Sequence, residues 1–245
     1  MISFVYPLKE KSRDYFRFEL LFSQINQSIL LQNDNEILVY FKSLFELIEL
    51  SERNDIRYEL IKDLRSLTTK MHAWLKHKEA DTEVIKDHIK ESEALINALF
   101  TMSKQLTFFK NDRFLITLKQ RFSIPGGYCN FDLPEYYVWL CQPLAERQQQ
   151  TIQWFEYFKP LEHALTLFLK MKRYQGTHSI ELAESGFYQG EVEDALFIEV
   201  KVDPKLKVYP MISGHRHRYS ITFVEANKGD KSSTEKVTEF EQLIC

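Results

Sequence analysis

The hydrophobic pattern of this chain changes its period once, close to Gly176, and no other feature constrains the fold as strongly. Up to about Tyr174, apolar residues recur every three or four positions, which is typical of amphipathic helices. Beyond that point the period falls to two, because apolar and polar residues alternate in 198–202 and 218–223. Helices followed by half-buried strands favour an α+β protein, with a helical bundle domain and a smaller, mainly antiparallel β-domain.

One predicted helix, which begins near Asn54, has an unusually regular apolar stripe. Its members are spaced by three or four residues over about five turns, so at ~1.5 Å per residue the helix spans roughly 30 to 35 Å. The stripe consists of Ile56, Leu60, Leu64, Leu67, Met71 and Trp74. Several such helices in succession favour an antiparallel bundle, in which this stripe is either core or the seam of a dimer.

A segment rich in proline and glycine, 123–134, interrupts the helical pattern. Asp132 followed by Glu135 resembles a helix start. The next residues, 136–140, are rich in aromatic and β-branched side chains, which favours a strand. Helix and strand therefore both remain open for 136–140.

These patterns divide the chain into two domains. Ile2–Tyr6 is predicted to be a short strand, and Pro7 is expected to open the first helix. The predicted helical domain covers 7–122, with 145–174 packing on it, and the predicted β-domain combines 123–144, 175–245 and the strand 2–6.

The composition is that of an ordinary globular protein, with 44% hydrophobic and 27% charged residues. A formal net charge of −3 argues against a protein that coats nucleic acid, which needs an excess of lysine and arginine. No apolar run approaches the roughly 18 residues of a membrane span, and the N-terminus lacks a signal-peptide pattern. We therefore expect a cytoplasmic protein that does not contact the membrane, with its three cysteines reduced.

Motifs that would indicate catalysis or metal binding are weak. The Pro125-Gly126-Gly127 turn lacks the lysine and the Ser/Thr of a phosphate-binding loop. His215 and His217 have a spacing that metal ligands sometimes show, but Arg216 and Arg218 beside them would repel a cation. We predict no catalytic residue and no metal site, and we do not expect an enzyme.

Two arginines near the end of the chain suggest a binding surface. If 213–224 is one strand, Arg216 and Arg218 lie on the same face, opposite Tyr219 and Ile221. Successive residues on one face of a strand stand roughly 6.6 Å apart. At that spacing, two guanidinium groups can each pair with a carboxylate of an extended peptide.

Arginines also recur every four residues in the helical part. Arg13 and Arg17 share one stripe of the first helix, and Arg53 and Arg57 repeat this spacing around the start of the third. In an alternative interpretation, these arginines pair with neighbouring carboxylates and only keep the bundle soluble. The acidic neighbours are Glu10, Asp14, Glu52 and Asp55.

Several segments, in matching order along essentially the whole chain, resemble one protein family. The most specific are Pro7-Leu8-Lys9-Glu10-Lys11 with Arg13 and Arg17, Glu52-Arg53 with Arg57 and Glu59-Leu60, Gln120-Arg121-Phe122-Ser123-Ile124-Pro125-Gly126-Gly127, Phe131-Asp132-Leu133-Pro134, Gly186-Phe187-Tyr188-Gln189, and Tyr209-Pro210-Met211-Ile212-Ser213-Gly214-His215. In these segments the chain resembles the ZapD family, Z-ring-associated proteins that bind the tubulin-like division protein FtsZ.

The resemblance implies a helical domain joined to a smaller β-domain, a symmetric homodimer, and neither catalytic activity nor a cofactor. It also implies a role at the division septum, where the dimer binds the acidic and apolar C-terminal tail of FtsZ and bundles FtsZ protofilaments. By this resemblance, the tail-binding residues are Arg17, Arg53, Arg113, Arg216 and Arg218. The chain departs from the family pattern at Arg216, which replaces a lysine, and at Tyr137, which replaces a histidine.

Two other classes of function remain as alternatives. A nucleic-acid-binding regulator would use the same basic face, but the net charge and the lack of a recognisable nucleic-acid-binding motif disfavour it. An enzyme of unknown type would need a deep pocket with several perturbed titratable groups.

Overall fold

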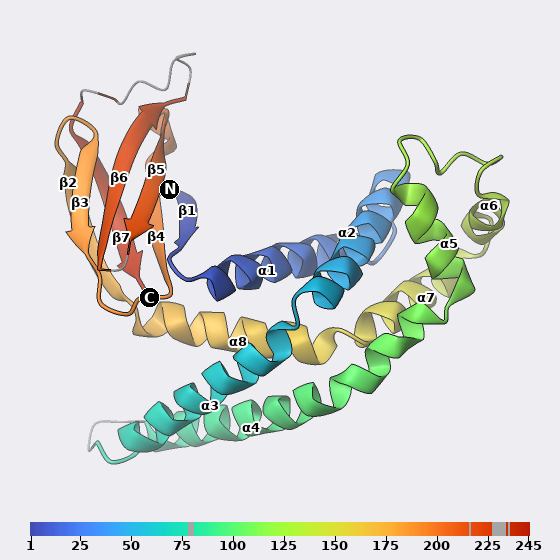
Figure 1. Ribbon diagram of the computed structural model, residues 1–245, viewed down its shortest axis with the longest axis horizontal. Coiled ribbons are helices and arrows are strands. Elements are labelled where there is room, and N and C mark those ends of the chain that lie inside the picture. Colours follow the sequence, from blue (N-terminus) through green and yellow to red (C-terminus); the bar gives the residue numbers. More distant parts are fainter. Residues whose placement is uncertain (78–80, 216, 227–233, 235) are drawn as a thin grey trace. The chain divides into compact units, whose positions relative to one another are not determined.

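The computed structural model describes residues 1–245 except 78–80, 216, 227–233 and 235. The described residues form helices and two antiparallel sheets, which confirms the α+β fold class (Figure 1). Their contacts divide the chain into a helical unit, Asp14–Phe168, and a β unit, Met1–Arg13 with Leu169–Cys245.

Two helices have residues in both units, and the others lie in the helical unit alone. The shared helices are α1 (Glu10–Ser28) and α8 (Lys159–Gln175). The others are α2 (Asp34–Arg53), α3 (Ile56–Trp74), α4 (Thr82–Gln105), η1 (Leu106–Lys110), α5 (Arg113–Phe122), α6 (Pro134–Leu140) and α7 (Leu144–Glu156).

Side chains cap the starts of three of these helices, among them α3, which the sequence predicts to begin near Asn54. Asn33 accepts a hydrogen bond of 3.1 Å from a first-turn backbone N–H of α2. Asp55 and Asp81 each accept such a bond of 3.2 Å, at the starts of α3 and α4. These side chains satisfy N–H groups that have no partner within the helix.

The regular stripe of α3 lies in the core of the helical unit. The stripe residues from Ile56 to Met71 are at most 6% exposed. Helices α3 and α4 pack against each other (Figure 1). Because the stripe is buried within the chain, it is core and does not form an exposed seam for a dimer.

The segment that the sequence left open between helix and strand is the helix α6. Its Tyr136 and Trp139 are three residues apart and therefore share one face, and each is 4% exposed. Both rings meet Phe41 of α2 edge to face, with centroids 5.8 and 5.2 Å away. Residues 123–144 thus belong to the helical unit, so placing them in the β-domain was wrong. The aromatic residues that suggested a strand pack in the core of the helical unit.

In the described part of the β unit, every strand pairing is antiparallel. One sheet has the order β1-β4-β7-β2, and the other has the order β3-β6-β5. The strands are β1 (Ile2–Pro7), β2 (Thr177–Ala183), β3 (Phe187–Glu191), β4 (Phe197–Val202), β5 (Val208–His215), β6 (Arg218–Glu225) and β7 (Thr238–Ile244).

Pro7 ends the first strand and does not open the first helix, which begins at Glu10. Pro7 pairs with Phe197 on β4, and β1 is an edge strand of its sheet. A proline has no N–H to donate to a neighbouring strand. It is tolerated in an edge strand, because such a strand has a neighbour on one side only.

The alternation predicted for β4 and β6 is confirmed. Val200 and Val202 of β4 and Ile221 and Phe223 of β6 are fully buried. With Phe240 of β7 they belong to one hydrophobic cluster, to which both sheets contribute. This cluster is the core of the β unit.

Candidate partner-binding site

Arg17 lies on α1 beside a carboxylate that also contacts the end of α2. Its Nη1 is 3.3 Å from Oδ1 of Asp14, and the Arg17 side chain is 60% exposed. The other oxygen, Asp14 Oδ2, accepts a hydrogen bond of 3.0 Å from Nδ2 of Asn54. Because Asn54 directly follows Arg53, this contact brings the segments of two predicted site residues together.

Arg53 is the last residue of α2. Its side chain is 74% exposed and forms an ion pair with Glu49, one turn earlier on the same helix. The sequence suggested Glu52 as a local ion-pair partner of Arg53, but Glu52 forms ion pairs with two lysines of another segment. Its Oε1 lies 3.9 Å from Nζ of Lys110, and its Oε2 lies 3.5 Å from Nζ of Lys119.

Arg113 is the first residue of α5, between these two lysines along the chain. It is exposed, and it forms no ion pair with any described residue. The Glu52 contacts thus join the segment that carries Arg113 to the end of α2. They do not place the Arg113 side chain against Arg17 or Arg53.

We call Arg17, Arg53, Lys110, Arg113 and Lys119 the helical basic surface. All five residues lie in the helical unit. The two lysines were missed by sequence reasoning, which relied on arginines repeated every four residues. Their approach to Glu52 depends on how α5 packs near α2, and no local spacing signals it.

The ion pairs of the helical basic surface are exposed and weak. The side chains of Arg17, Arg53 and Lys110 are 60%, 74% and 66% exposed. Pairs of this kind contribute roughly 0 to 1 kcal/mol each, because water and salt screen them. A ligand with several carboxylates can therefore exchange with Glu49 and Glu52 at small cost. Asp14 is only 14% exposed and stays beside Arg17, whose own side chain is open to a further carboxylate.

Arg57 differs from these residues because it forms two side-chain hydrogen bonds with its neighbour Asp55. Its Nε donates a hydrogen bond of 2.7 Å to Oδ1 of Asp55, and its Nη2 donates to Oδ2. The hydrogen bond from Arg57 lowers the pKa of the Asp55 carboxyl below its usual value, and the pair raises the pKa of Arg57. Only 14% of the Arg57 side chain is exposed, so its role at the start of α3 is structural.

Arg218 is the first residue of β6 in the β unit. Its side chain is 69% exposed, and its Nε lies 3.6 Å from Oε1 of Glu191 on the neighbouring strand β3. The single strand predicted over 213–224 is wrong, because β5 ends at His215 and pairs with β6, which begins at Arg218. Arg216 lies outside the described residues.

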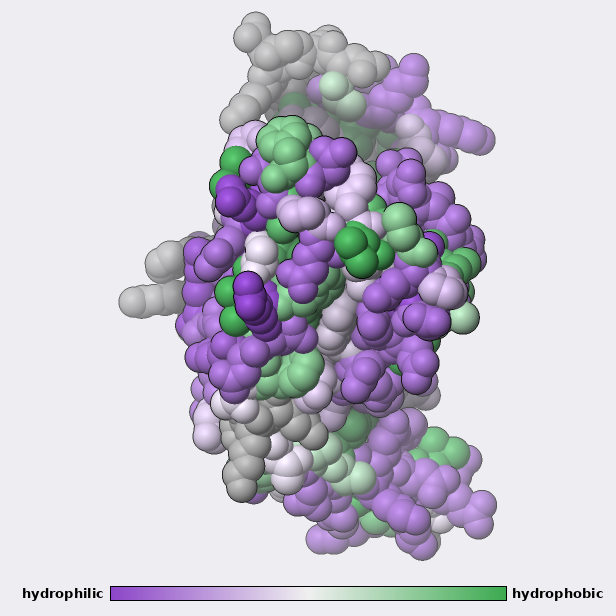
Figure 2. Space-filling model, turned by 90° about the vertical axis from the view of Figure 1, so that its right-hand side faces the viewer, coloured by the Kyte–Doolittle hydropathy of each residue, from purple (hydrophilic) through white to green (hydrophobic). Residues whose placement is uncertain are grey.

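Figure 2 views the molecule from the side on which α5 and α6 lie in Figure 1. Hydrophilic residues cover most of this face, and hydrophobic residues form separate patches among them. The segment 123–140 contributes exposed apolar side chains, among them Phe131, Tyr137 and Val138. Tyr137, at the position where the family pattern has a histidine, is 42% exposed.

The described residues contain no group of three or more His, Cys, Asp or Glu side chains that could hold a metal ion. Likewise, within the described ranges no helix combines the length and apolar character needed to cross a membrane.

Comparison with known proteins gives one consistent family. A family model described as "ZapD: Cell division protein" matches residues 16–222. Full-length curated relatives carry the same description. "Cell division protein ZapD" of Vibrio parahaemolyticus is 34% identical over 242 residues, covering 99% of this chain and 98% of the relative. The protein of that name from Pectobacterium atrosepticum is 33% identical over 244 residues, covering 100% of this chain and 97% of the relative. These descriptions all name cell division.

Proposed function

Because the chain belongs to the ZapD family of cell division proteins, we propose that it binds the C-terminal tail of FtsZ and bundles FtsZ protofilaments at the septum. The observation that carries the proposal is the helical basic surface. It consists of cations on α1, at the end of α2 and near α5, and the ion pairs that these cations form are weak.

Charge exchange is the basis of binding in this proposal. Carboxylates of the tail replace Glu49 beside Arg53 and bind the exposed side of Arg17, and Arg113 offers a guanidinium that has no ion-pair partner among the described residues. A guanidinium binds a carboxylate through two parallel hydrogen bonds, which fixes the geometry of the contact. The proposed tail-binding residues also include Arg218, which has a separate exposed contact in the β unit. Arg216 is included because of the family resemblance.

Bundling requires more than one tail-binding surface in each particle. We propose that the protein acts as a homodimer, so that each dimer offers two equivalent surfaces to neighbouring protofilaments. Once one surface has bound, the second encounters tails at a high effective concentration, which multiplies the overall affinity on a polymer.

A titration of the full chain with a synthetic FtsZ C-terminal peptide tests tail binding. Because the contact is between exposed charges, affinity should fall steeply between about 50 mM and about 200 mM salt. Binding of duplex DNA at physiological salt, together with no affinity for the peptide, would instead favour a nucleic-acid-binding regulator.

A charge-reversal pair tests the surface itself. Arg17→Glu/Arg53→Glu should abolish most peptide binding and the co-sedimentation of the protein with FtsZ filaments. The matched control is Lys86→Glu/Lys90→Glu, which makes the same charge change on exposed positions of α4. If both double variants co-sediment equally well, the helical basic surface is not the tail-binding site.

Arg218 can be tested separately, with Lys205→Glu as a control at an exposed lysine of the same unit. We expect Arg218→Glu to weaken peptide binding more than Lys205→Glu does. Light scattering of filaments mixed with the protein, beside the measured mass of the free protein, tests bundling by a dimer. A monomer that bundles filaments would contradict that part of the proposal.

A further inference from the structure

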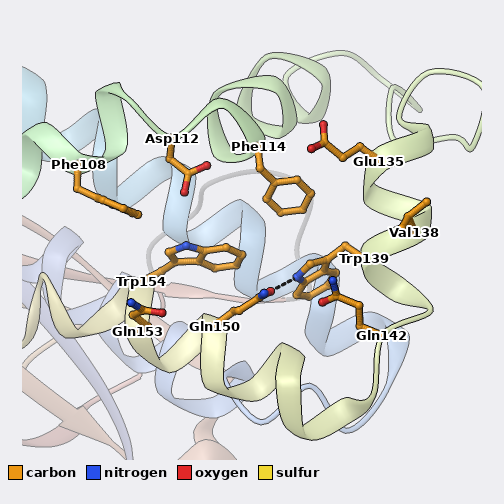
Figure 3. A pocket seen from close by; sticks show the side chains of 10 residues that line it. All are labelled: Phe108, Asp112, Phe114, Glu135, Val138, Trp139, Gln142, Gln150, Gln153 and Trp154. Carbon is orange, nitrogen blue, oxygen red and sulfur yellow. Dashed lines mark hydrogen bonds between the residues drawn. The ribbon is translucent and has the colours of Figure 1, made fainter.

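A concave site lies in the helical unit, between the start of α5, α6 and α7 (Figure 3). It is a cavity of about 480 Å³. Its charge is opposite to that of the helical basic surface, since its lining includes two carboxylates and no lysine, arginine or histidine. The lining residues are Phe108, Asp112, Phe114, Glu135, Val138, Trp139, Gln142, Gln150, Gln153 and Trp154.

Aromatic rings form one wall of the cavity. Trp154 stacks with Phe114 at a centroid distance of 6.0 Å and with Trp139 at 6.3 Å. The indole N–H of Trp139 donates a hydrogen bond of 2.5 Å to Oε1 of Gln150, which fixes that ring (Figure 3). The cavity therefore presents a preorganised aromatic surface, and aromatic faces carry partial negative charge that attracts cations.

Two carboxylates, Asp112 and Glu135, stand on the same side of the two tryptophans in Figure 3. Asp112 uses Oδ1 to cap α5, accepting a hydrogen bond of 3.0 Å from the backbone N–H of Leu115. Neither carboxylate forms an ion pair with the described residues. The cavity therefore has two negative charges that the chain itself does not neutralise.

A third acceptor comes from Gln142. Its Oε1 is shielded from solvent and has no hydrogen-bond partner among the described residues. A buried carbonyl oxygen without a donor costs free energy, and a ligand that brings an N–H group would remove that cost. Asp112, Glu135 and Gln142 all offer acceptors, so the cavity is suited to a ligand rich in donors.

We infer that this cavity binds the guanidinium group of an arginine side chain presented by a protein ligand. A guanidinium has five N–H donors in one plane, stacks on aromatic rings and is weakly hydrated. It thus matches the carboxylates, the free acceptor and the aromatic wall together. Arg147 of this chain lies over the ring of Trp139, 5.7 Å from its centroid, so this aromatic cluster already has one guanidinium beside it.

Other ligand classes match the cavity less well. A phosphate or a nucleotide would meet two uncompensated carboxylates. A neutral apolar group would leave those carboxylates and Gln142 Oε1 without partners. This inference does not depend on tail binding at the helical basic surface, because it uses a different set of residues.

The test uses the full-length ¹⁵N-labelled protein and the peptide acetyl-Gly-Arg-Gly-amide. Titration should shift the indole N–H signals of Trp139 and Trp154 and leave that of Trp74, which does not line the cavity, unchanged. The same peptide with citrulline, a neutral isostere of arginine, should bind at least ~10-fold more weakly because it loses the charge-assisted hydrogen bonds.

Variants separate the charge of the cavity from its shape. Asp112→Asn/Glu135→Gln removes both charges and keeps a side chain that can cap α5, and it should weaken binding of the arginine peptide at least ~10-fold. Glu146→Gln/Glu156→Gln, at exposed positions of α7 outside the cavity, is the matched control and should bind as the parent chain does. Gln153→Glu adds a carboxylate to the lining and should tighten binding. Equal affinity for the arginine and citrulline peptides, or unchanged affinity in Asp112→Asn/Glu135→Gln, would overturn the inference.

Discussion

Asn54, the C-cap residue of α2, donates a hydrogen bond of 3.0 Å to the same Asp14 carboxylate that pairs with Arg17 on α1. One carboxylate thus positions an arginine and ties two helices together. Since Arg53 directly precedes Asn54, this link holds together the helix segments that carry two cations of the helical basic surface.

Replacing Asn54 tests this link. Asn54→Ala should lower the free energy of unfolding by about 0.5 to 1 kcal/mol, because an exposed hydrogen bond to a charged group is lost. It should also weaken binding of the FtsZ tail peptide, though less than Arg17→Glu/Arg53→Glu does. Urea denaturation and peptide titration measure the two effects.

The control for this change is Asn97→Ala on α4. Asn97 is exposed and makes no side-chain hydrogen bond with the described residues. This variant should be neutral or slightly stabilising, because alanine favours a helix interior. If the two alanine variants have equal stability and equal affinity, the Asn54–Asp14 contact contributes nothing.

The Asp55–Arg57 pair predicts a dependence of stability on pH. Its hydrogen bond lowers the folded-state pKa of Asp55, so the pair stabilises the protein above the unfolded-state pKa of about 4. That contribution is lost as the pH falls through the folded-state pKa. Asp55→Asn keeps an acceptor for the α3 cap but removes the ion pair. Its stability should therefore decrease less than that of the parent chain between about pH 5 and about pH 2.

Arg57→Gln removes the same pair from the other side and should give a pH profile between those of the parent chain and Asp55→Asn, because the Asp55 carboxyl still accepts the backbone N–H of residue 57. Denaturation curves recorded at several pH values measure the stability of the parent chain and of both variants. Parallel profiles for the parent chain and both variants would mean that the pair contributes no pH-dependent stability.

Elements specified by local signals were predictable from the sequence. Asn33 marks the start of α2 because its side chain accepts a hydrogen bond from the backbone N–H of Glu36, and alternating residues place Val200 and Ile221 in the β core. The local sequence could not decide between helix and strand for α6, because its aromatic residues are common in strands. The helical conformation lets Tyr136 and Trp139 pack together on Phe41, which lies far away in the sequence. The end of β5 at His215 was also missed, because 213–218 contain no apolar side chain whose spacing could mark the end of a strand.

The candidate site was only partly accessible to sequence reasoning. Spacing identified Arg17 and Arg53, and family resemblance added Arg113. The approach of Lys110 and Lys119 to Glu52 joins segments far apart along the chain, which periodicity cannot reveal. The cavity at Trp154 was missed for the same reason.

A buried hydrogen bond in the β unit gives a further stability prediction. The hydroxyl of Tyr219 donates to Oε1 of Gln242 at 2.6 Å, and both residues are buried. Burial also raises the pKa of Tyr219 above its usual value, so the hydroxyl stays protonated. Tyr219→Phe leaves the Gln242 oxygen without its donor and should cost about 1 to 3 kcal/mol in the free energy of unfolding.

Two comparisons make this test specific. Tyr209→Phe removes a hydroxyl that has no hydrogen-bond partner among the described residues, so it should be close to neutral. Tyr219→Phe/Gln242→Leu removes both partners and should recover part of the lost stability. Equal unfolding midpoints for the two single variants would rule out a stabilising role for the Tyr219–Gln242 bond.

The cysteines should differ in reactivity towards iodoacetamide. Burial raises the pKa of the Cys245 thiol to about 11, whereas Cys141 is exposed. The thiolate is the nucleophile, so near pH 8 Cys245 should react at least ~10-fold more slowly than Cys141. The backbone N–H of Cys245 donates a hydrogen bond of 3.0 Å to the carbonyl of Phe197, which holds the last residue in the sheet against fraying. Peptide mapping by mass spectrometry over time measures both rates, and denaturant should remove the difference. Equal rates without denaturant would show that the end of β7 does not stay packed in solution.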